Sequence, residues 1–170
     1  MSKLYIMMGI PGSGKSTWCK NNVPVGASYI SRDKIRFSML GPGEAYFSKE
    51  NQVYAIFIKQ INKALANDKV VYADQTSLDA RARAKLINSL AIKPEEIHVV
   101  WLNTPLAKCL SRNELRTGLS RVPRRNIEQM YNNLTRPSWS EGIKYLHIIT
   151  NDVIEEIVDL EKEALEGWSL

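Results

Sequence analysis

Residues 9–16 read Gly-Ile-Pro-Gly-Ser-Gly-Lys-Ser and match the pattern G-x-x-x-x-G-K-[ST] at every fixed position. An apolar run precedes the motif and a helical stretch follows it, which is the context of a phosphate-binding loop. Its glycines let backbone N–H groups turn toward phosphate oxygens, and the following helix adds its positive N-terminal end. We therefore expect Lys15 to reach the β- and γ-phosphates of ATP and Ser16 to bind Mg²⁺. The predicted nucleotide-binding residues here are Gly9, Pro11, Gly12, Ser13, Gly14, Lys15, Ser16 and Thr17.

Short apolar runs alternate with longer helical patterns along the chain. The runs that predict strands are 3–8, 27–31, 69–73, 97–102 and 144–149. This alternation is typical of an α/β fold with a central, mostly parallel sheet of about five strands and helices on both faces. In such sheets ligands bind beyond the carboxyl ends of the strands.

Helix signals separate these strands. Residues 49–67 repeat apolar side chains at helical spacing. Thr104 followed by Pro105 predicts an N-cap and a first helical residue, and Pro123 predicts the start of another helix. Asp152 with Glu155 resembles a capping box that opens the last helix.

The composition is that of a globular domain. The chain has 170 residues, of which 44% are hydrophobic and 24% charged, so we expect one domain over residues 1–170. The sequence contains no apolar run of the roughly 20 residues that a membrane helix needs, so no membrane partner is expected. Without a secretory signal, Cys19 and Cys109 are expected to be free thiols in a cytoplasmic protein.

Charge is unevenly distributed along the chain, whose net charge is +5. Residues 112–136 hold six arginines and two glutamates, whereas residues 152–166 hold seven acidic residues and one lysine. A basic segment of this kind favours a polyanionic partner, although a solvated basic face has the same composition.

Two further segments favour transfer of a phosphoryl group to an acceptor. Asp33 and Arg36 follow a predicted strand and share a helix face. One can accept a hydroxyl proton while the other binds an anionic phosphate, unless Asp33 only caps the helix. Asp74 ends the apolar run 70–73 and suits a carboxylate that binds Mg²⁺ directly or through water, or else starts a turn.

The third segment is arginine-rich and contains Gly118, which we expect to act as its pivot. Residues 112–122 are predicted to form a lid that closes over the triphosphate and supplies an arginine to the transferring group. An exposed basic loop is the alternative.

These motifs together resemble the kinase domain of phage-type polynucleotide 5′-kinases. The motifs that carry the resemblance are GIPGSGKSTW at 9–18, SRDKIR at 31–36, DQTSL at 74–78, and the segment 112–131 with its Arg-Asn start and its Val122-Pro123. The resemblance implies that Asp33 is the general base, that Arg36 binds the acceptor's 3′-phosphate, and that Arg116 is the lid arginine on the ATP phosphates.

The chain also departs from that family's pattern. The spacing between Arg116 and Val122 is one residue longer, so Arg121 is a second candidate for the lid role. Many relatives carry a phosphatase domain that begins with D-x-D, and this sequence contains no such spacing. The predicted catalytic residues are therefore Asp33, Lys15 and Arg116, with Arg121 added to the ATP-binding set. The predicted substrate-binding residues are Arg36, Asp74, Thr76 and Arg112, and the predicted metal ligands are Ser16 and Asp74.

The sequence thus predicts an ATP- and Mg²⁺-dependent kinase that phosphorylates the 5′-hydroxyl of DNA or RNA in nucleic acid repair. Its expected partners are nucleic acid 5′ ends and a separate ligase or phosphatase, and its oligomeric state is left open. A P-loop kinase with a small acceptor, such as a nucleoside, a sugar nucleotide or an antibiotic, is the first alternative. An NTP-binding switch module without an acceptor is the second.

Overall fold

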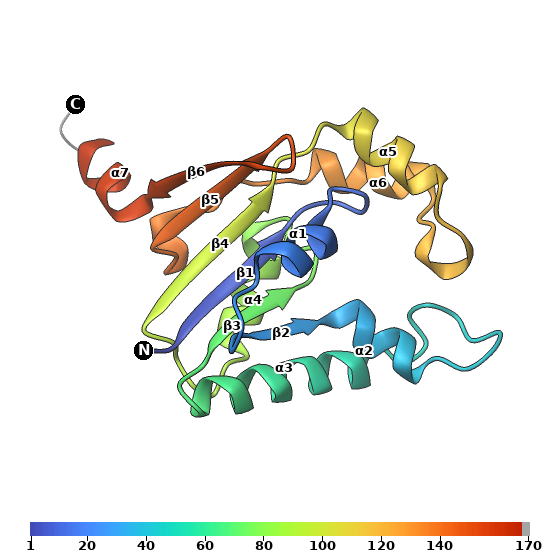
Figure 1. The fold of residues 1–170 in the computed structure, drawn as a ribbon, viewed down its shortest axis with the longest axis horizontal. Coiled ribbons are helices and arrows are strands. Elements are labelled where there is room, and N and C mark those ends of the chain that lie inside the picture. The colour runs from blue at the N-terminus through green and yellow to red at the C-terminus, as the bar shows by residue number, and fades with distance from the viewer. Residues whose placement is uncertain (168–170) are drawn as a thin grey trace.

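A computed structural model describes residues 1–167, which form a six-stranded sheet in the order β2-β3-β1-β4-β5-β6 (Figure 1). The strands are β1 (Lys3–Met8), β2 (Ser28–Ser31), β3 (Val70–Asp74), β4 (Glu96–Leu102), β5 (Tyr145–Thr150) and β6 (Ile154–Asp159). The first five pair in parallel, and β6 pairs with β5 in the antiparallel sense. The predicted α/β fold is confirmed, with one strand more than expected.

The last strand corrects the expected capping box. Asp152 lies in the turn between β5 and β6 with a φ of 67°, and Glu155 lies within β6. The last helix begins only at Leu160. The acidic residues of 152–159 therefore belong mainly to an edge hairpin, in which the first four residues of β6 are exposed.

Helices connect the strands and cover both faces of the sheet (Figure 1). They are α1 (Lys15–Asn22), α2 (Arg32–Met39), α3 (Glu50–Ala66), α4 (Ala80–Asn88), α5 (Leu106–Glu114), α6 (Arg124–Asn132) and α7 (Leu160–Gly167), with short 3-10 turns η1 (Gly118–Ser120) and η2 (Trp139–Glu141). Two predicted helix starts differ by one residue, because Pro105 and Pro123 precede their helices as N-cap residues. Thr104 does not cap α5, because its hydroxyl donates instead to the carbonyl oxygen of Ser13 at 2.8 Å.

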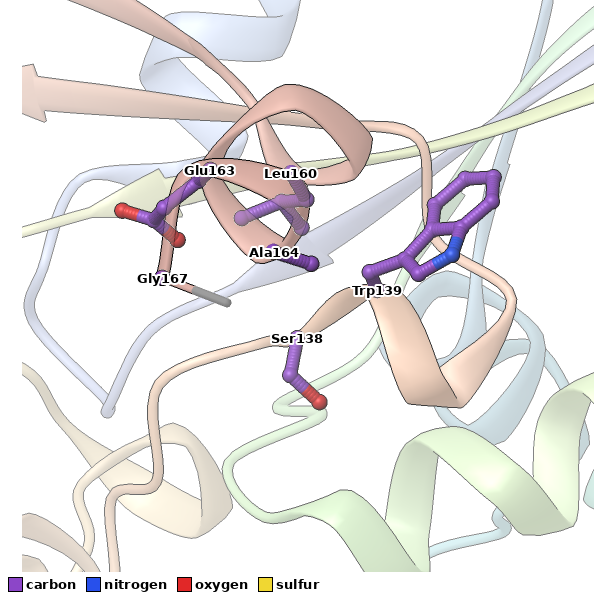
Figure 2. A pocket seen from close by; sticks show the side chains of 6 residues that line it. All are labelled: Ser138, Trp139, Leu160, Glu163, Ala164 and Gly167. Carbon is purple, nitrogen blue, oxygen red and sulfur yellow. The ribbon is translucent and has the colours of Figure 1, made fainter. Parts of the chain in front are cut away.

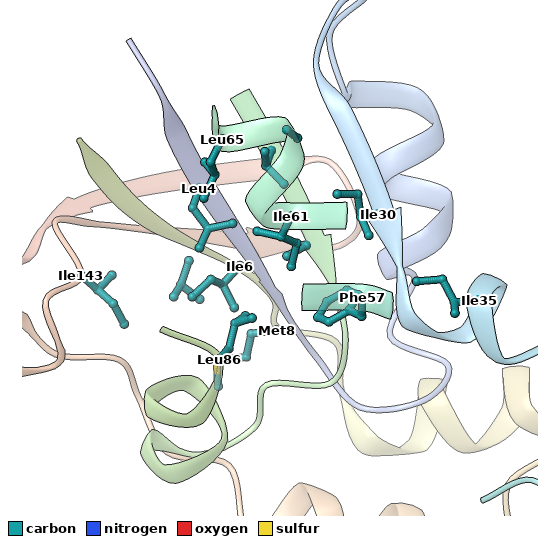
Figure 3. Close-up of a cluster of buried hydrophobic side chains, with 14 of the residues drawn as sticks. Leu4, Ile6, Met8, Ile30, Ile35, Phe57, Ile61, Leu65, Leu86 and Ile143 are labelled. Atoms are coloured by element: carbon teal, nitrogen blue, oxygen red, sulfur yellow. The ribbon is translucent and has the colours of Figure 1, made fainter. Parts of the chain in front are cut away.

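The larger hydrophobic core lies between the sheet and the helices α3 and α4. Figure 3 shows Ile6 of β1 among Phe57 and Ile61 of α3 and Leu86 of α4. All four side chains are fully buried. Truncating a buried phenylalanine such as Phe57 to alanine typically costs about 3–5 kcal/mol of stability. This packing fixes β1, and β1 in turn delivers the phosphate-binding loop.

A smaller core lies on the opposite face of the sheet, beneath α1. Cys19 of α1 packs there with Met7 and Val100, and burial raises the pKa of its thiol to about 12. Cys109 is buried elsewhere, so both cysteines are buried free thiols, as expected. Among residues 1–167, no helix combines the length and the apolar character needed to cross a membrane.

One buried ion pair joins distant segments of the chain. Arg83 of α4 has no exposed surface and donates to both carboxylate oxygens of Glu141, at 2.7 and 2.9 Å. It also donates to the carbonyl oxygens of Ser77 and Thr135. Removing one partner of such a buried pair costs about 3–5 kcal/mol, so Arg83 is a structural residue.

Candidate nucleotide- and acceptor-binding site

The phosphate-binding loop joins β1 to α1 and depends on two glycines with positive φ. Gly12 has a φ of 84° and Gly14 a φ of 97°, a region that costs other residues about 1–2 kcal/mol. A side chain at Gly12 also has no room, because its Cβ would lie 2.4 Å from the carbonyl oxygen of Cys109. The loop is therefore packed directly against α5.

Three hydrogen bonds hold the loop to neighbouring segments. Gly9 N–H donates to the carbonyl oxygen of Thr76 at 3.2 Å, and Thr104 supports Ser13 from the end of β4. Arg112 of α5 donates to the carbonyl oxygen of Gly12 at 3.2 Å. Two of these contacts fix loop carbonyl groups, those of Ser13 and Gly12, and the third uses the N–H of Gly9.

Arg112 lies at this loop and also binds a carboxylate in the β5–β6 turn. Its second hydrogen bond, of 2.7 Å, goes to Asp152, which Lys108 also contacts at 2.8 Å. Hydrogen bonds from Arg112 and then Lys108 hold the pKa of Asp152 below its ordinary value. Both contacts of Arg112 thus lie beside the phosphate-binding loop, where we expect the nucleotide to bind.

Lys15, Ser16 and Asp74 form the centre of the site. Lys15 Nζ donates to the carbonyl oxygen of Gly9 at 2.9 Å, and Ser16 Oγ lies 3.5 Å from Oδ2 of Asp74. Asp74 is only 5% exposed and accepts a 2.6 Å hydrogen bond from Tyr29, which the sequence did not single out. Burial and the neighbouring Asp74 raise the pKa of Tyr29.

The donor atoms at this centre suit Mg²⁺. This ion takes one or two carboxylate or hydroxyl oxygens from the protein and completes its octahedron with water and phosphate oxygens. The Ser16 hydroxyl and the Asp74 carboxylate both offer oxygen atoms that can ligate a metal ion, and these atoms lie 3.5 Å apart. They adjoin the predicted phosphate position. The residues present therefore fit the ion.

A cavity of about 650 Å³ opens beside the loop. It lies between α1, α5 and the β5–β6 turn, and its lining includes Gly14, Thr17, Arg112, Arg116, Asp152 and Glu155. A second cavity, of about 590 Å³, lies between η2 and α7, where Ser138, Trp139 and Leu160 line it (Figure 2). Because only the first cavity adjoins the phosphate-binding loop, it is the candidate nucleotide cavity.

Asp33 does not cap its helix, and part of its carboxylate is open to solvent. The N-cap of α2 is Ser31, whose Oγ accepts a hydrogen bond from Lys34 N–H at 3.3 Å. The side chain of Asp33 is 61% exposed. Its Oδ1 accepts hydrogen bonds from Arg36 and from Tyr46, the latter at 2.6 Å. Among residues 1–167 its Oδ2 has no hydrogen-bond partner, so one oxygen remains available.

Arg36 is buried beneath Asp33 and is held by a glutamate. It is 4% exposed, and its Nε and Nη2 donate to Oε2 of Glu50 at 3.2 and 2.7 Å. Its Nη1 donates to Asp33 and to the Tyr46 hydroxyl. Burial opposes ionisation of Glu50, but hydrogen bonds from Arg36 and Arg32 outweigh it and hold the pKa of Glu50 below its ordinary value.

The same glutamate connects this group to the segment after β3. Glu50 also binds Arg32, whose Nη1 donates to Gln75 at 2.9 Å. Thr76, the next residue, is exposed and contacts the phosphate-binding loop through its carbonyl group. Ion pairs and a side-chain amide contact thus connect Arg36 and Asp33 to Gln75, whose neighbour Thr76 contacts the phosphate-binding loop.

The predicted lid, residues 112–122, begins in the last turn of α5 and continues through the segment that leads to α6. Arg116 lines the nucleotide cavity and makes one long hydrogen bond, of 3.4 Å, to the carbonyl oxygen of Ser120. Arg121 is engaged elsewhere, in a 2.5 Å ion pair with Glu114. Asn113, which the sequence did not indicate, binds both the N–H and the carbonyl group of Val122 and so ties the two ends of the lid together.

Acidic residues partner most of the basic segment 112–136. The ion pairs are Arg112–Asp152, Arg121–Glu114, Arg124–Glu128 and Arg136–Glu163. Within the described residues, Arg116 and Arg125 are the arginines of this segment without an ion pair. The segment is therefore less available to a polyanion than its composition suggests.

Comparison with known proteins agrees with this geometry. A family model described as AAA domain matches residues 4–137, which hold the phosphate-binding loop, Asp33, Asp74 and the lid. The chain belongs to this AAA domain family. A curated relative of this AAA domain protein is Transcription factor bHLH140 of Arabidopsis thaliana, which is 31% identical over 115 residues. The match covers 68% of this chain but only 12% of that protein.

Solved structures share the fold of this AAA domain protein at low identity. A chain of the Pnkp1/Rnl/Hen1 RNA repair complex aligns with a TM-score of 0.65 and 19% identity, over 94% of this chain and 48% of that chain. Kti12 of Chaetomium thermophilum, solved with ADP-AlF3, aligns at 0.63 and 17%, over 98% and 97%. A gluconokinase from Sinorhizobium meliloti 1021 aligns at 0.53 and 23%, over 79% and 76%. The fold is therefore the one that P-loop kinases have.

Proposed function

We propose that this AAA domain is an ATP-dependent kinase for the 5′-hydroxyl of a polynucleotide. The observation that carries the proposal is the position of the Asp33 carboxylate. Its Oδ2 has no hydrogen-bond partner among residues 1–167, and it lies at the carboxyl ends of the strands, where the phosphate-binding loop also lies. Ser31, two residues before Asp33, is in register with Asp74, and Asp74 contacts Ser16 of the loop. A general base and a γ-phosphate site at one sheet edge suit transfer to a hydroxyl.

In this mechanism Oδ2 of Asp33 accepts the proton of the 5′-hydroxyl as its oxygen attacks the γ-phosphorus. The bond from that phosphorus to the β–γ bridging oxygen breaks, and ADP leaves with the electron pair. Lys15, Arg116 and the loop N–H groups stabilise charge on the transferring group. Ser16 and Asp74 would hold Mg²⁺, which supplies further positive charge to the phosphates when bound.

In this proposal the acceptor lies beside Arg36 and Thr76. Arg36 uses four of its five N–H groups on Asp33, Tyr46 and Glu50, which leaves one Nη2 N–H for the acceptor's 3′-phosphate. We infer that its main task is to position Asp33. Arg112 belongs to ATP binding rather than to the acceptor, because it contacts Gly12 and lines the nucleotide cavity.

A small-molecule acceptor is the second candidate. The ion pairs that neutralise Arg112, Arg121, Arg124 and Arg136 favour it, because a small acceptor needs little positive surface beyond the ATP site. The structural likeness to a gluconokinase also supports it. If the acceptor is a nucleic acid end, a separate ligase or phosphatase in the cytoplasm is the expected partner.

The test is transfer from labelled ATP to a panel of acceptors. The panel holds a 5′-hydroxyl DNA oligonucleotide, the matching RNA, a nucleoside 3′-phosphate, a plain nucleoside and a sugar acid. We expect the oligonucleotides to have the highest kcat/KM. A preference for the nucleoside or the sugar acid would support the second candidate, and ATP hydrolysis without any phosphorylated acceptor would indicate a switch module.

Asp33→Asn separates catalysis from binding within this test. Positioned acid–base catalysis contributes about 10²–10⁴-fold, so kcat should fall by that factor with ATP affinity unchanged. Asp68→Asn is the matched control, because Asp68 is also an exposed aspartate but lies before β3, at the other end of the sheet. Equal effects of the two substitutions would remove Asp33 from the mechanism.

A further inference from the structure

Three aromatic side chains gather beside the candidate base. Phe37 of α2 contacts Tyr46 with ring centroids 6.0 Å apart, and Tyr46 contacts Phe47 at 4.7 Å, both edge to face. Tyr46 and Phe47 belong to residues 40–49, which project from the sheet between α2 and α3 (Figure 1). We call Phe37, Tyr46 and Phe47 the aromatic cluster.

The aromatic cluster does not belong to the hydrophobic core. Phe47 is 68% exposed and Phe37 42% exposed, whereas the remaining phenylalanine, Phe57, is fully buried. Phenylalanine is usually buried, and two exposed copies that meet through one tyrosine form an apolar surface that packing alone does not explain.

The inner side of the aromatic cluster is already occupied. The guanidinium carbon of Arg36 lies 4.2 Å from the ring centre of Tyr46 and 5.8 Å from that of Phe47. Arg36 therefore covers the cluster from the protein side by cation–π contact, and the surface of Phe47 that remains open faces outward.

We propose that the aromatic cluster stacks against the nucleobase of the acceptor's 5′-terminal nucleotide, with Phe47 as the main platform. This inference rests on the proposed polynucleotide acceptor and extends it to a base-binding subsite. The Tyr46 hydroxyl touches Asp33, so the cluster is continuous with the reacting position. In a nucleotide one sugar ring joins the 5′-hydroxyl to the base, so a hydroxyl at Asp33 brings the base to these rings.

Stacking also predicts which acceptors the protein should distinguish. Every base has a π-face, so aromatic platforms bind single strands with little sequence preference. The subsite should therefore distinguish an acceptor that has a terminal base from one that lacks it, and should not distinguish the four bases strongly. A sugar acid has no π-face, so a small non-aromatic acceptor could not stack against the aromatic cluster.

The experiment compares two 5′-hydroxyl oligonucleotides that differ only at the terminal nucleotide, which carries a base in one and is abasic in the other. The wild-type protein should prefer the base-bearing oligonucleotide. Phe47→Ala should lower kcat/KM for it by about 5- to 150-fold, the range that alanine substitution of a stacking residue gives. Turnover of the abasic oligonucleotide should not change, and Phe47→Tyr should keep the preference.

Val25→Ala is the matched control, because Val25 is an exposed apolar residue in the loop before β2, at the opposite end of the sheet from Asp33. It should leave both rates unchanged. Equal losses on both oligonucleotides, or a base preference that survives Phe47→Ala, would overturn the stacking site while the proposed kinase stands. Wild-type protein that phosphorylates neither oligonucleotide would overturn the proposed function itself and the stacking site with it.

Discussion

The hydroxyl of Tyr46 donates a 2.6 Å hydrogen bond to Oδ1 of Asp33, thirteen residues earlier in the chain. Arg36 donates to the same carboxylate oxygen and also to the tyrosine hydroxyl, so the three side chains form a closed ring of hydrogen bonds. The ring fixes the orientation of the carboxylate and directs Oδ2 away from it. Tyr46 is therefore a positioning residue for the proposed base.

Tyr46→Phe should lower kcat while keeping the aromatic ring. A hydrogen bond to a charged group contributes about 1.5–3 kcal/mol, so we expect a loss of at least about tenfold. KM for ATP and the melting temperature should stay close to wild type, because the substitution leaves the phosphate-binding loop and the core untouched. Steady-state kinetics with both substrates measure this, and an unchanged kcat would mean that Arg36 alone orients Asp33.

Lys15→Ala should strongly lower the rate of phosphoryl transfer without unfolding the protein. Lys15 is half-buried at the start of α1 and contacts only the carbonyl oxygen of Gly9 through its amino group. Loss of one group that stabilises transition-state charge costs about 10²–10³-fold in kcat. Lys20→Ala, on an exposed face of the same helix, is the control and should leave kcat intact. Retained turnover in a folded Lys15→Ala protein would contradict the loop's assigned role.

Gly12→Ala should damage the loop through contact as well as through backbone strain. Gly26→Ala provides the comparison, because Gly26 has a φ of 93° but no atom within 4 Å of its would-be Cβ. Both substitutions carry the penalty of positive φ, about 1–2 kcal/mol, and only Gly12→Ala adds the clash with Cys109. Thermal melts and ATP titrations should find a larger loss of stability at Gly12, with loss of ATP affinity at Gly12 alone.

Salt dependence tests whether the basic segment touches an acceptor strand. Each phosphate contacted on a single strand contributes a slope of roughly −0.7 in log K against log salt. Arg125 has no ion pair among the described residues, whereas Arg124 pairs with Glu128 at 2.8 Å. Arg125→Ala should therefore flatten the slope more than Arg124→Ala, with ATP affinity unchanged. Identical slopes in all three proteins would identify the segment as a solvated face.

Acid should weaken the fold through Glu96, which begins β4. Hydrogen bonds from Lys144, His98 and Lys3 hold the pKa of Glu96 at about 2, below its ordinary 4.5. A lowered carboxyl pKa contributes stability that is complete above the ordinary value and is lost as pH falls toward the folded value. The wild-type advantage over Glu96→Gln should therefore be constant above pH 4.5 and shrink as the pH falls to about 2. Urea unfolding across that range measures it, with Glu161→Gln as the exposed control.

The sequence predicted the features of this protein that depend on residues close together in the chain. The phosphate-binding loop, five strands and the shared helix face of Asp33 and Arg36 follow from spacing along the chain. Strand β6 was missed because its Ile-Glu-Glu-Ile-Val-Asp sequence is acidic, and glutamate is depleted in strands. This strand forms because β5 offers it an edge to pair with.

The side chains that orient the site were not predictable in the same way. Glu50 reaches Arg36 from fourteen residues away, and Tyr29 reaches Asp74 across neighbouring strands. Neither contact has a fixed spacing that a motif records, because both depend on how α2, α3 and the sheet pack. Two of the four ion pairs of the basic segment have the same origin, since Asp152 and Glu163 come from the far end of the chain. The other two, Arg121–Glu114 and Arg124–Glu128, are local pairs within the segment.

The first strand of this sheet in chain order is an interior strand of the finished sheet. β1 pairs with β3 on one side and β4 on the other, so its two edges are covered only after residues 74 and 102 have been synthesised. The supports from Thr76 and Thr104 to the loop that follows β1 arrive equally late. An unpaired apolar strand is prone to join other chains. The nascent chain therefore carries an incompletely paired apolar β1 until residue 102 has been synthesised.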